Sequence, residues 1–478
     1  MVPHIVPSRH RRTASRSFRL LTVLAIAVAA PSAAAIEWTE RFDGPDHLAD
    51  VGTAVVAGPE GSVYVAGSSA GWVDPSLATN SRILLRIAAD GTRLWERRDT
   101  IGFSGSSTAN LAVDSAGNLL VLTTEEPFAG VVIDKISPQG ALLWSQSFSP
   151  PGGNFARAEG IAIGPGDTVH ATWFEYNLGD VGAVVKLEPT GAVDWTRRYA
   201  GPGGGAEPAA IAVDAAGAVY VAGSATVGDS ADLALWQYSA AGEFAWVKVE
   251  GSPLGFAHDR AVGLALDGNT ALVAGTWAMN SGVGNDFVVV RIDAAGQRLW
   301  LTTSRNPAGD SDWAYGMTLA ADGRIYVAGA SEIAPNHLAP VVAAFDSAGQ
   351  PLWSRSFDGG VAANGYFFGV ACDAAGHPYA AGYDSDTTVG QSIFVAALAE
   401  DGTPVWTSRH APVTGQPSEA AALVVTSDSA VVVTGSTWFE RPSGGFDRDL
   451  VTLRYRGAGL FFDGFEAGDP GRWSALEP

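Results

Sequence analysis

The chain has 478 residues, of which 47% are hydrophobic and 10% aromatic, with 50 acidic against 29 basic residues and a single cysteine. This apolar fraction excludes a disordered chain, and one cysteine excludes an intrachain disulfide framework or a zinc site built from several thiolates. The acidic excess argues against nucleic acid as a partner, because its phosphates would be repelled.

The N-terminal segment 1–35 has the pattern of an export signal. Arginines precede the apolar run 20–30, and small residues follow it up to Ala35. The run is too short for a bilayer span, and no later stretch approaches the roughly 18 uninterrupted apolar residues of a spanning helix. We therefore expect an exported bacterial protein (periplasmic, at the cell surface or extracellular) without a transmembrane segment in its mature chain. A short membrane anchor is the alternative interpretation of this segment.

A repeat of about 50 residues dominates the rest of the chain. At regular intervals of 49 to 54 residues, a glycine is followed four residues later by a tryptophan: Gly91 and Trp95, Gly140 and Trp144, Gly191 and Trp195, Gly242 and Trp246, Gly296 and Trp300, Gly349 and Trp353, Gly402 and Trp406. Each glycine closes a turn such as 293–296, which follows a β-branched run such as 287–293. A second hairpin, such as 211–223, lies upstream. Four short strands per unit is the period of a propeller blade.

The two ends of the repeat are complementary. A marker that we interpret as the end of the second strand recurs eight times, at Gly67, Thr123, Trp173, Gly223, Gly275, Gly329, Gly382 and Gly435. The eighth turn glycine, Gly459, has no tryptophan after it, whereas Trp38 has no strand before it. We therefore predict an all-β, eight-bladed propeller over 36–459, with four-stranded antiparallel blades and the N-terminal strand closing the ring. Seven blades or an open solenoid are the alternatives.

The repeated tryptophans are expected to pack between neighbouring blades, because an indole supplies a large apolar area with a donor at its rim. The hairpins DSAGN (114–118) and DAAGAVYVAG (214–223) resemble bacterial β-propeller repeats of many exported proteins, the SBBP type. The glycine–tryptophan spacing is similar to that of eight-bladed quinoprotein-type propellers and of outer-membrane assembly lipoproteins. Quinoprotein dehydrogenases place adjacent cysteines beside their cofactor, and the lipoproteins begin with cysteine, so Cys372 alone matches neither pattern.

Binding is expected on one face of the ring. Within each unit we letter the four strands a to d in chain order. The a–b and c–d turns are short and share one face of the ring. The b–c and d–a connections share the other face, which we call the long-loop face. Its aromatic residues are predicted to bind a ligand, as a stacking platform for a glycan or an anchor for a protein: Trp173, Tyr176, Trp277, Trp313, Tyr315 and Trp438. Packing within the blades is the alternative role for these rings.

The acidic residues of the long-loop face are weak candidates for a metal site. The candidates are Asp229, Asp232, Asp384, Asp386, Asp447 and Asp449 of the b–c segments, which also contain Asp286; the d–a segments contain His47 and Asp50, His258 and Asp259, and Asp310 and Asp312. Calcium prefers several oxygen ligands. Aspartates in loops more often hydrogen-bond their own backbone, and no EF-hand-like loop occurs. No cofactor is therefore expected, with calcium as the alternative.

No sequence motif identifies a catalytic site. There is no paired histidine pattern in the chain after the export signal. We predict a monomeric, non-catalytic propeller that binds a protein or glycan through its long-loop face. The alternative is a secreted carbohydrate-active hydrolase or lyase with carboxylates around the central channel. The tail 460–478 resembles a C-terminal segment that recurs on exported proteins of some Gram-negative bacteria; an extra segment packed on the disc is the alternative.

Overall fold

The computed structural model describes residues 32–33, 35–45, 47–74, 77–103, 110–125, 130–152, 155–176, 180–251, 259–280, 284–304, 311–358, 364–386, 390–441 and 444–456. All of them belong to the compact unit that spans Ser32–Pro478. The predicted signal up to residue 31, the turn glycine Gly459 and the tail 460–478 lie outside the described residues.

The described strands form eight antiparallel sheets. Blade 1 contains β3 (Asp50–Ala57), β4 (Val63–Asp74), β5 (Leu77–Ile87) and β6 (Arg93–Phe103); blade 2 contains β7 (Asn110–Val113), β8 (Leu119–Glu125), β9 (Gly130–Ile136) and β10 (Leu142–Phe148). Blade 3 contains β11 (Phe155–Ile163), β12 (Val169–Tyr176), β13 (Val181–Leu187) and β14 (Val193–Tyr199); blade 4 contains β15 (Ala206–Val213), β16 (Val219–Val227), β17 (Ser230–Tyr238) and β18 (Phe244–Glu250).

The second half of the ring repeats this order. Blade 5 contains β19 (Arg260–Asp267), β20 (Thr270–Asn280), β21 (Gly284–Asp293) and β22 (Arg298–Ser304); blade 6 contains β23 (Asp312–Leu319), β24 (Ile325–Ala334), β25 (His337–Phe345) and β26 (Pro351–Ser356). Blade 7 contains β27 (Tyr366–Cys372), β28 (Pro378–Asp386), β29 (Gly390–Leu398), β30 (Pro404–His410) and the added β1 (Ser32–Ala33), which pairs parallel with β30. Blade 8 contains β31 (Glu419–Val425), β32 (Val431–Glu440), β33 (Phe446–Tyr455) and β2 (Ile36–Phe42).

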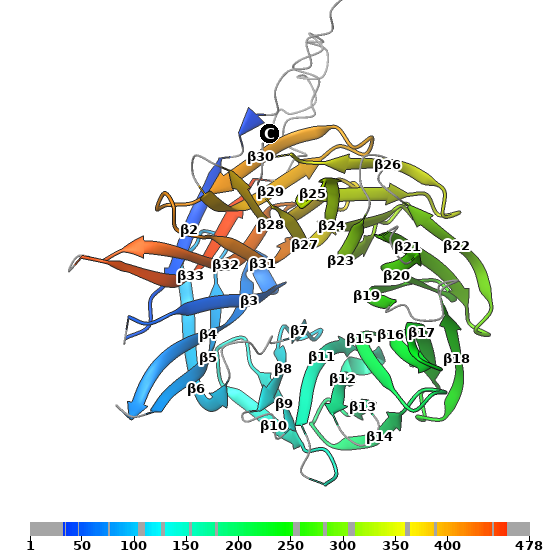
Figure 1. Ribbon diagram of the computed structural model, residues 1–478. Helices are drawn as coiled ribbons and strands as arrows, with labels where there is room; N and C mark the ends of the chain where they lie inside the picture. The colour runs from blue at the N-terminus through cyan, green and yellow to red at the C-terminus, as the bar shows by residue number, and fades with distance from the viewer. Residues whose placement is uncertain are drawn as a thin grey trace, which may run out of the picture. The chain divides into compact units, whose positions relative to one another are not determined.

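The blades follow one another around a ring, with the first strand of each blade nearest the centre (Figure 1). Each of these inner strands contacts the inner strand of the next blade, and β31 contacts β3, so the ring is closed. The eight-bladed prediction is confirmed, and the seven-bladed and open alternatives are wrong. The helices within the described ranges are two 3-10 turns, η1 (Pro59–Gly61) and η2 (Pro165–Asp167); neither has the length or apolar character to cross a membrane.

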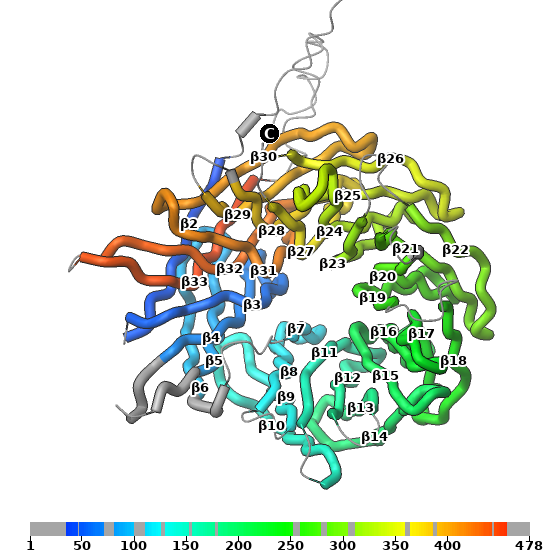
Figure 2. Tube along the Cα trace, in the orientation of Figure 1, coloured from blue at the N-terminus to red at the C-terminus, as the bar shows by residue number. Residues whose placement is uncertain are grey.

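The predicted closure by the N-terminal strand is also confirmed. Strand β2 pairs antiparallel with β33, from Ile36 opposite Tyr455 to Phe42 opposite Leu450. Figure 2 shows the blue start of the described chain beside its orange-red end. The two ends of the described chain thus meet inside one sheet. Strand β2 completes blade 8 as its fourth, outer strand and pairs with the edge of β33.

The apolar cores lie between blades. The described residues form eight buried apolar clusters, and each cluster draws side chains from two adjacent blades. The cluster at the join packs Phe42 and Leu450 of blade 8 against Val65 and Ile83 of blade 1. Strands in the middle of each sheet need apolar residues on both faces for this packing, which explains their continuous β-branched runs.

Within the described residues, seven repeated tryptophans each pack on the turn glycine of the next blade, as the sequence predicts in general terms. Trp38 donates from Nε1 to the carbonyl oxygen of Ala89 (2.9 Å), and a Cβ added to Gly91 would lie 2.8 Å from its ring. The same glycine–indole contact joins Trp95 to Gly140, Trp144 to Gly191, Trp195 to Gly242, Trp246 to Gly296, Trp300 to Gly349, and Trp353 to Gly402. All these glycines have positive φ, so the turn needs glycine for its backbone and for the indole above it.

The marker glycines do not end the second strands, and that part of the prediction is wrong. Strand β24, for example, continues past Gly329 to Ala334 and turns through two residues into β25. The glycine is needed because strand β23 bulges beside it: a Cβ at Gly329 would lie 1.8 Å from the carbonyl oxygen of Trp313. The b–c segments are therefore extended hairpins rather than long loops, and several predicted site residues lie in strands.

A buried histidine gives the fold a predictable response to acid. His170 on β12 is fully buried, with its ring centroid 6.3 Å from that of Trp195 in the same blade. Burial lowers the pKa of His170 from 6.5 to about 4. The unfolded chain binds the proton near pH 6.5 and the folded chain only near pH 4, so this contribution to stability is complete above pH 6.5 and is lost as the pH falls between those values.

We expect His170→Gln to remove this part of the acid sensitivity. Compared with the variant, the parent protein should lose up to about 3 kcal/mol of unfolding free energy between about pH 7 and pH 4. Urea midpoints of both proteins, measured across that range, give the difference directly. Carboxylates that titrate in the same range affect the parent and the variant equally, so their contribution cancels in the difference between the two unfolding free energies. Unfolding free energies of the two proteins that fall in parallel with pH would contradict the prediction.

Candidate functional site

A pocket of about 440 Å³ opens at the central channel, between the inner strands of blades 3 to 6. These strands begin at the long-loop face, where the d–a connections enter them. The pocket lining combines charged, amide, hydroxyl and aromatic side chains with small apolar ones: Glu159, Ala209, Arg260, Ala261, Val262, Thr276, Asn285, Trp313, Ala314 and Tyr315. A concave site with a few convergent polar groups is the usual form of a small-molecule or sugar site.

Two positions of the repeat supply most of this lining. In seven blades the inner strand carries a β-bulge, whose extra residue has no cross-strand partner. The bulged residues are Thr53, Glu159, Ala209, Val262, Tyr315, Phe368 and Ala421, and the residues two positions earlier are Val51, Arg157, Glu207, Arg260, Trp313, Tyr366 and Glu419. The register of the repeat therefore brings residues about 50 apart in sequence to one level of the channel.

The charged part of the site is held by Arg157. Its Nε donates to Glu159 (2.5 Å), one Nη donates to Glu207 (2.5 Å), and the other donates to the Tyr176 hydroxyl (2.8 Å). Arg260 lies 4.0 Å from the same Glu207 carboxylate. Two glutamates and two arginines from blades 3, 4 and 5 thus form one network beside the pocket.

The carboxyl group of Glu159 has a strongly perturbed acidity. Burial raises the pKa of Glu159 to about 7, against the opposing effect of the Arg157 charge. The side chain is 11% exposed, so it reaches the pocket while most of it is out of water. Near neutral pH the group therefore exists in both protonation states and can either donate or accept a hydrogen bond.

Three of the six aromatic residues predicted from sequence come together here. Trp313 and Tyr315 line the pocket, and Tyr176 is joined to it through Arg157, whose guanidinium lies 5.8 Å from the Tyr176 ring centroid. Tyr315 is 39% exposed and packs edge-on against Tyr366 at 5.8 Å. Trp313, Tyr315 and Tyr366 thus belong to blades 6 and 7, whereas Tyr176 and the charged network belong to blades 3 to 5.

The other three predicted aromatics lie elsewhere. Trp173 is 1% exposed, packs against Phe148 at 5.3 Å and donates to Glu175 (2.9 Å). Trp277 is 6% exposed in the core between blades 4 and 5. Trp438 is partly exposed on β32 of blade 8, opposite Arg448. Burial leaves Trp173 and Trp277 no free ring face, so the structure gives these two the packing role.

The predicted acidic residues separate into two groups. Asp229 is exposed in the β16–β17 turn, Asp232 accepts a hydrogen bond from Ser230 (3.0 Å), and Asp384 pairs with Arg409. The side chain of Asp386 lies outside the described residues. Among the side chains that the structure describes, Asp229, Asp232 and Asp384 do not belong to a group that could share a metal ion.

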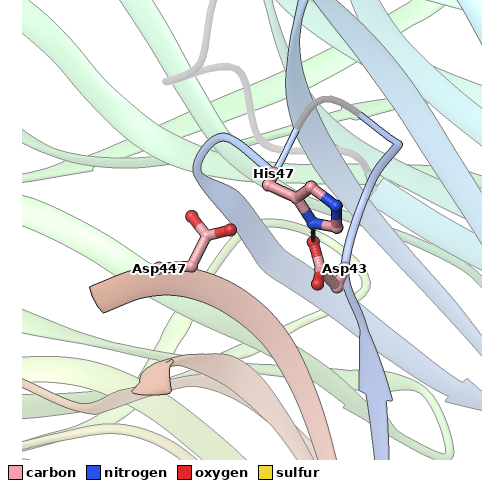
Figure 3. Close-up of side chains that lie close together, drawn as sticks. All are labelled: Asp43, His47 and Asp447. Carbon is pink, nitrogen blue, oxygen red and sulfur yellow. Dashed lines mark hydrogen bonds and ion pairs between the residues drawn. The ribbon is translucent and has the colours of Figure 1, made fainter. Parts of the chain in front are cut away.

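Asp447 and Asp449 do belong to such groups. Asp447 gathers with Asp43 and His47, as Figure 3 shows, and Asp449 gathers with Asp43 and Asp50; in each group one ligand atom per residue lies within 4.8 Å of the others. Burial raises the pKa of Asp50 and that of Asp449 to about 6. Two of the six candidates, Asp447 and Asp449, thus lie in a cluster at the ring closure that also contains Asp43, His47 and Asp50.

Sequence reasoning did not find Arg157, Glu159, Glu207 or Arg260. Glu159 is a bulged residue of an inner strand, and the other three lie two positions before a bulged residue. Their shared position in the repeat is therefore the sequence feature that relates them. Aligning the inner strands by their bulges and reading one position across all blades would have grouped them. No local motif could do so, because each blade contributes one or two residues only.

Comparisons with known proteins agree with the fold. The family described as "Outer membrane protein assembly factor BamB" matches residues 129–284, and no curated protein sequence matches the chain. Sqt1 from Chaetomium thermophilum is 14% identical with a TM-score of 0.53, covering 89% of this chain and 100% of Sqt1. The dihydro-heme d1 dehydrogenase NirN in complex with DHE is 14% identical with a TM-score of 0.47, covering 87% of this chain and 75% of NirN. These likenesses concern the fold, and the chain is a β-propeller that contains a BamB-type repeat segment.

Proposed function

We propose that this protein is an exported, non-catalytic β-propeller that binds a glycan in the channel pocket of its long-loop face. The observation that carries the proposal is a pocket of about 440 Å³ whose lining combines the rings of Trp313 and Tyr315 with the charged side chains of Glu159 and Arg260. The proposed export rests on the N-terminal segment 1–35.

A sugar matches this combination of side chains. Its apolar C–H face packs on an indole or phenol ring, while its hydroxyls take hydrogen bonds from charged and amide groups around the ring edge. Asn285 and Thr276 add an amide and a hydroxyl to the lining. The pocket has the volume of a typical ligand site, which accommodates one or two sugar units rather than a folded partner.

Binding is favoured over hydrolysis because of how the two channel carboxylates are engaged. Glycosidases use one carboxyl group as an acid and a second, free carboxylate as nucleophile or base. Glu159 has an acidity suited to the first role. Glu207, however, pairs through Oε1 with Arg157, and the same oxygen lies 4.0 Å from Arg260, so this carboxylate is engaged by guanidinium groups through one of its oxygens.

Trp313→Ala is expected to weaken binding about tenfold or more, since the loss of one stacking ring is worth roughly 1–3 kcal/mol. The ligand is first identified on a glycan array with the full chain, and affinities are then measured by calorimetry. Trp438→Ala is the matched control, because it removes a partly exposed tryptophan outside the pocket. Equal affinities of the two variants, or binding to no glycan at all, would contradict the proposal.

The enzymatic alternative has its own readout. The bound glycan is incubated with the parent protein and with Glu159→Gln, and products are followed by chromatography. Turnover by the parent that the substitution abolishes would replace binding by hydrolysis as the function.

A protein ligand is the second candidate, favoured by the match of residues 129–284 to a family whose name describes an assembly factor. In that case the exposed rings of Tyr176 and Tyr315, each 39% exposed, would serve as anchors. Cross-linking at Tyr315 in cells, followed by identification of the attached protein, distinguishes this candidate from the glycan.

A further inference from the structure

The join of the first and last blades carries a cluster of acidic residues from three separate segments. Asp43 and His47 follow β2, Asp50 begins β3, and Asp447 and Asp449 lie on β33. His47 Nδ1 lies 2.8 Å from a carboxylate oxygen of Asp43, and Figure 3 shows Asp447 facing the same space. The segments that close the ring therefore all contribute to one small volume.

The spacing of the carboxylates suits one cation. One oxygen each from Asp43, Asp50 and Asp449 lies within 4.8 Å of the others. Two oxygens bound to one calcium ion, each at about 2.3–2.6 Å, are at most about 5 Å apart. The three oxygens thus already have a separation that coordination permits.

A second observation points to a ligand at this place. Asp50 and Asp449 are both 0% exposed. The Ser69 hydroxyl interacts with the Asp50 carboxyl group, but in each aspartate the oxygen Oδ1 has no partner with hydrogen-bond geometry among the described residues. Their other oxygens are held, by the Gly44 N–H (2.6 Å) and by Arg41 Nε respectively. Asp447, 3% exposed, repeats the pattern, with Oδ1 paired to Arg441 and Oδ2 bare.

Bare, buried carboxylate oxygens are costly unless a cation satisfies them. In blade 7 a buried aspartate, Asp384, pairs with one arginine, Arg409. At the join, four aspartates face two arginines that contact them, Arg41 and Arg441, so two negative charges among these described groups remain unbalanced. A divalent ion carries the charge that is missing.

We propose that Asp43, Asp50 and Asp449 bind a calcium ion that ties β2, β3 and β33 together at the closure of the ring. All three ligands are carboxylate oxygens, which a hard cation such as calcium prefers. The side chain of Asp43 is 26% exposed, so the ion and its water ligands can reach the site from solvent. Because β2 and β33 come from opposite ends of the chain, the ion supplies a link between them that the backbone lacks. The proposal is independent of the glycan pocket.

The test compares melting temperatures of the full chain after metal removal, in EDTA and in about 5 mM CaCl2. A site with the affinity of extracellular calcium modules raises the melting temperature by at least about 1 °C at this concentration. Calorimetry should show one site per chain, and hydrogen exchange of the β2 amides should slow several-fold with calcium.

The variants Asp449→Asn and Asp43→Asn should each abolish the calcium-dependent shift in melting temperature. Because Asp43 is partly exposed, Asp43→Asn should fold even if the substitution of the buried Asp449 prevents folding. Asp384→Asn is the matched control, a buried aspartate paired with arginine in blade 7, and it should keep the shift. Identical melting with calcium and EDTA, or a shift that survives both cluster substitutions, overturns the proposal. A shift with zinc but not calcium also overturns it and points to the mixed set Asp43, His47 and Asp447.

Discussion

Deletion of Ile36–Phe42 is expected to prevent the protein from forming a stable ring. This segment, β2, supplies the outer strand of blade 8 and pairs with β33 over its whole length. Phe42 is 2% exposed in the core between blades 8 and 1, and Trp38 covers the turn glycine Gly91. Loss of either side chain costs about 3–5 kcal/mol, so loss of both approaches the net stability of a typical fold. Solubility, circular dichroism and thermal melting of the deletion protein measure the effect.

A circular permutant provides the control for this deletion. It begins at His47 and ends at Asp43, and the turn sequence 399–403 joins Tyr455 to Ile36, as it joins Leu398 to Pro404 in blade 7. The permutant restores β2 as the fourth strand of its own blade and should fold. A deletion protein that melts like the parent would show that β2 is dispensable and would contradict the closure mechanism.

The second large effect is expected from Gly349→Ala, at about 2–5 kcal/mol of unfolding free energy. Gly349 has φ +79, where an alanine costs about 1–2 kcal/mol, and its Cβ would lie 2.6 Å from the Trp300 ring. Moving an indole that is packed between two blades adds an overpacking cost of about 1–3 kcal/mol. Urea or thermal unfolding followed by tryptophan fluorescence measures the loss.

Gly415→Ala separates the two contributions. Gly415 has φ +80, nearly the same backbone conformation, but a Cβ there would meet nothing within 4 Å. It should therefore lose only the backbone term, about 1–2 kcal/mol. Equal losses at the two glycines would mean that the tryptophan contact contributes nothing to blade packing.

The blade count and the closure were predictable because both depend on residues that recur in register. The glycine–tryptophan spacing marks one turn and one strand in every unit, and the unpaired Trp38 and Gly459 mark the two ends of the count. The end of the second strand was mispredicted, because Gly329 and its equivalents are required by the neighbouring bulge rather than by a turn. A glycine in a strand does not reveal which of these reasons selected it.

The candidate site was only partly predictable. Trp313, Tyr315 and Tyr176 were found because aromatic residues near strand ends are conspicuous, whereas Trp173 and Trp277 share that signal and are buried. For the metal candidates, Asp447 and Asp449 could be recognised, but the choice of these over Asp384 depends on the surrounding charges.

The residue pattern alone was sufficient to predict the class of fold, the number of blades and the contact that joins them. Each of these features depends on residues that recur seven or eight times, and such a repeat can be recognised in the linear sequence. The pocket at blades 3 to 6 and the acidic cluster at the ring closure, by contrast, each belong to one part of the described ring. Their members come from different blades or from opposite ends of the chain, as Asp43 and Asp449 do, and sequence separation carries no information about such distances. Their assembly follows from ring closure and from the bulges that direct side chains into the channel, which are properties of the folded sheets.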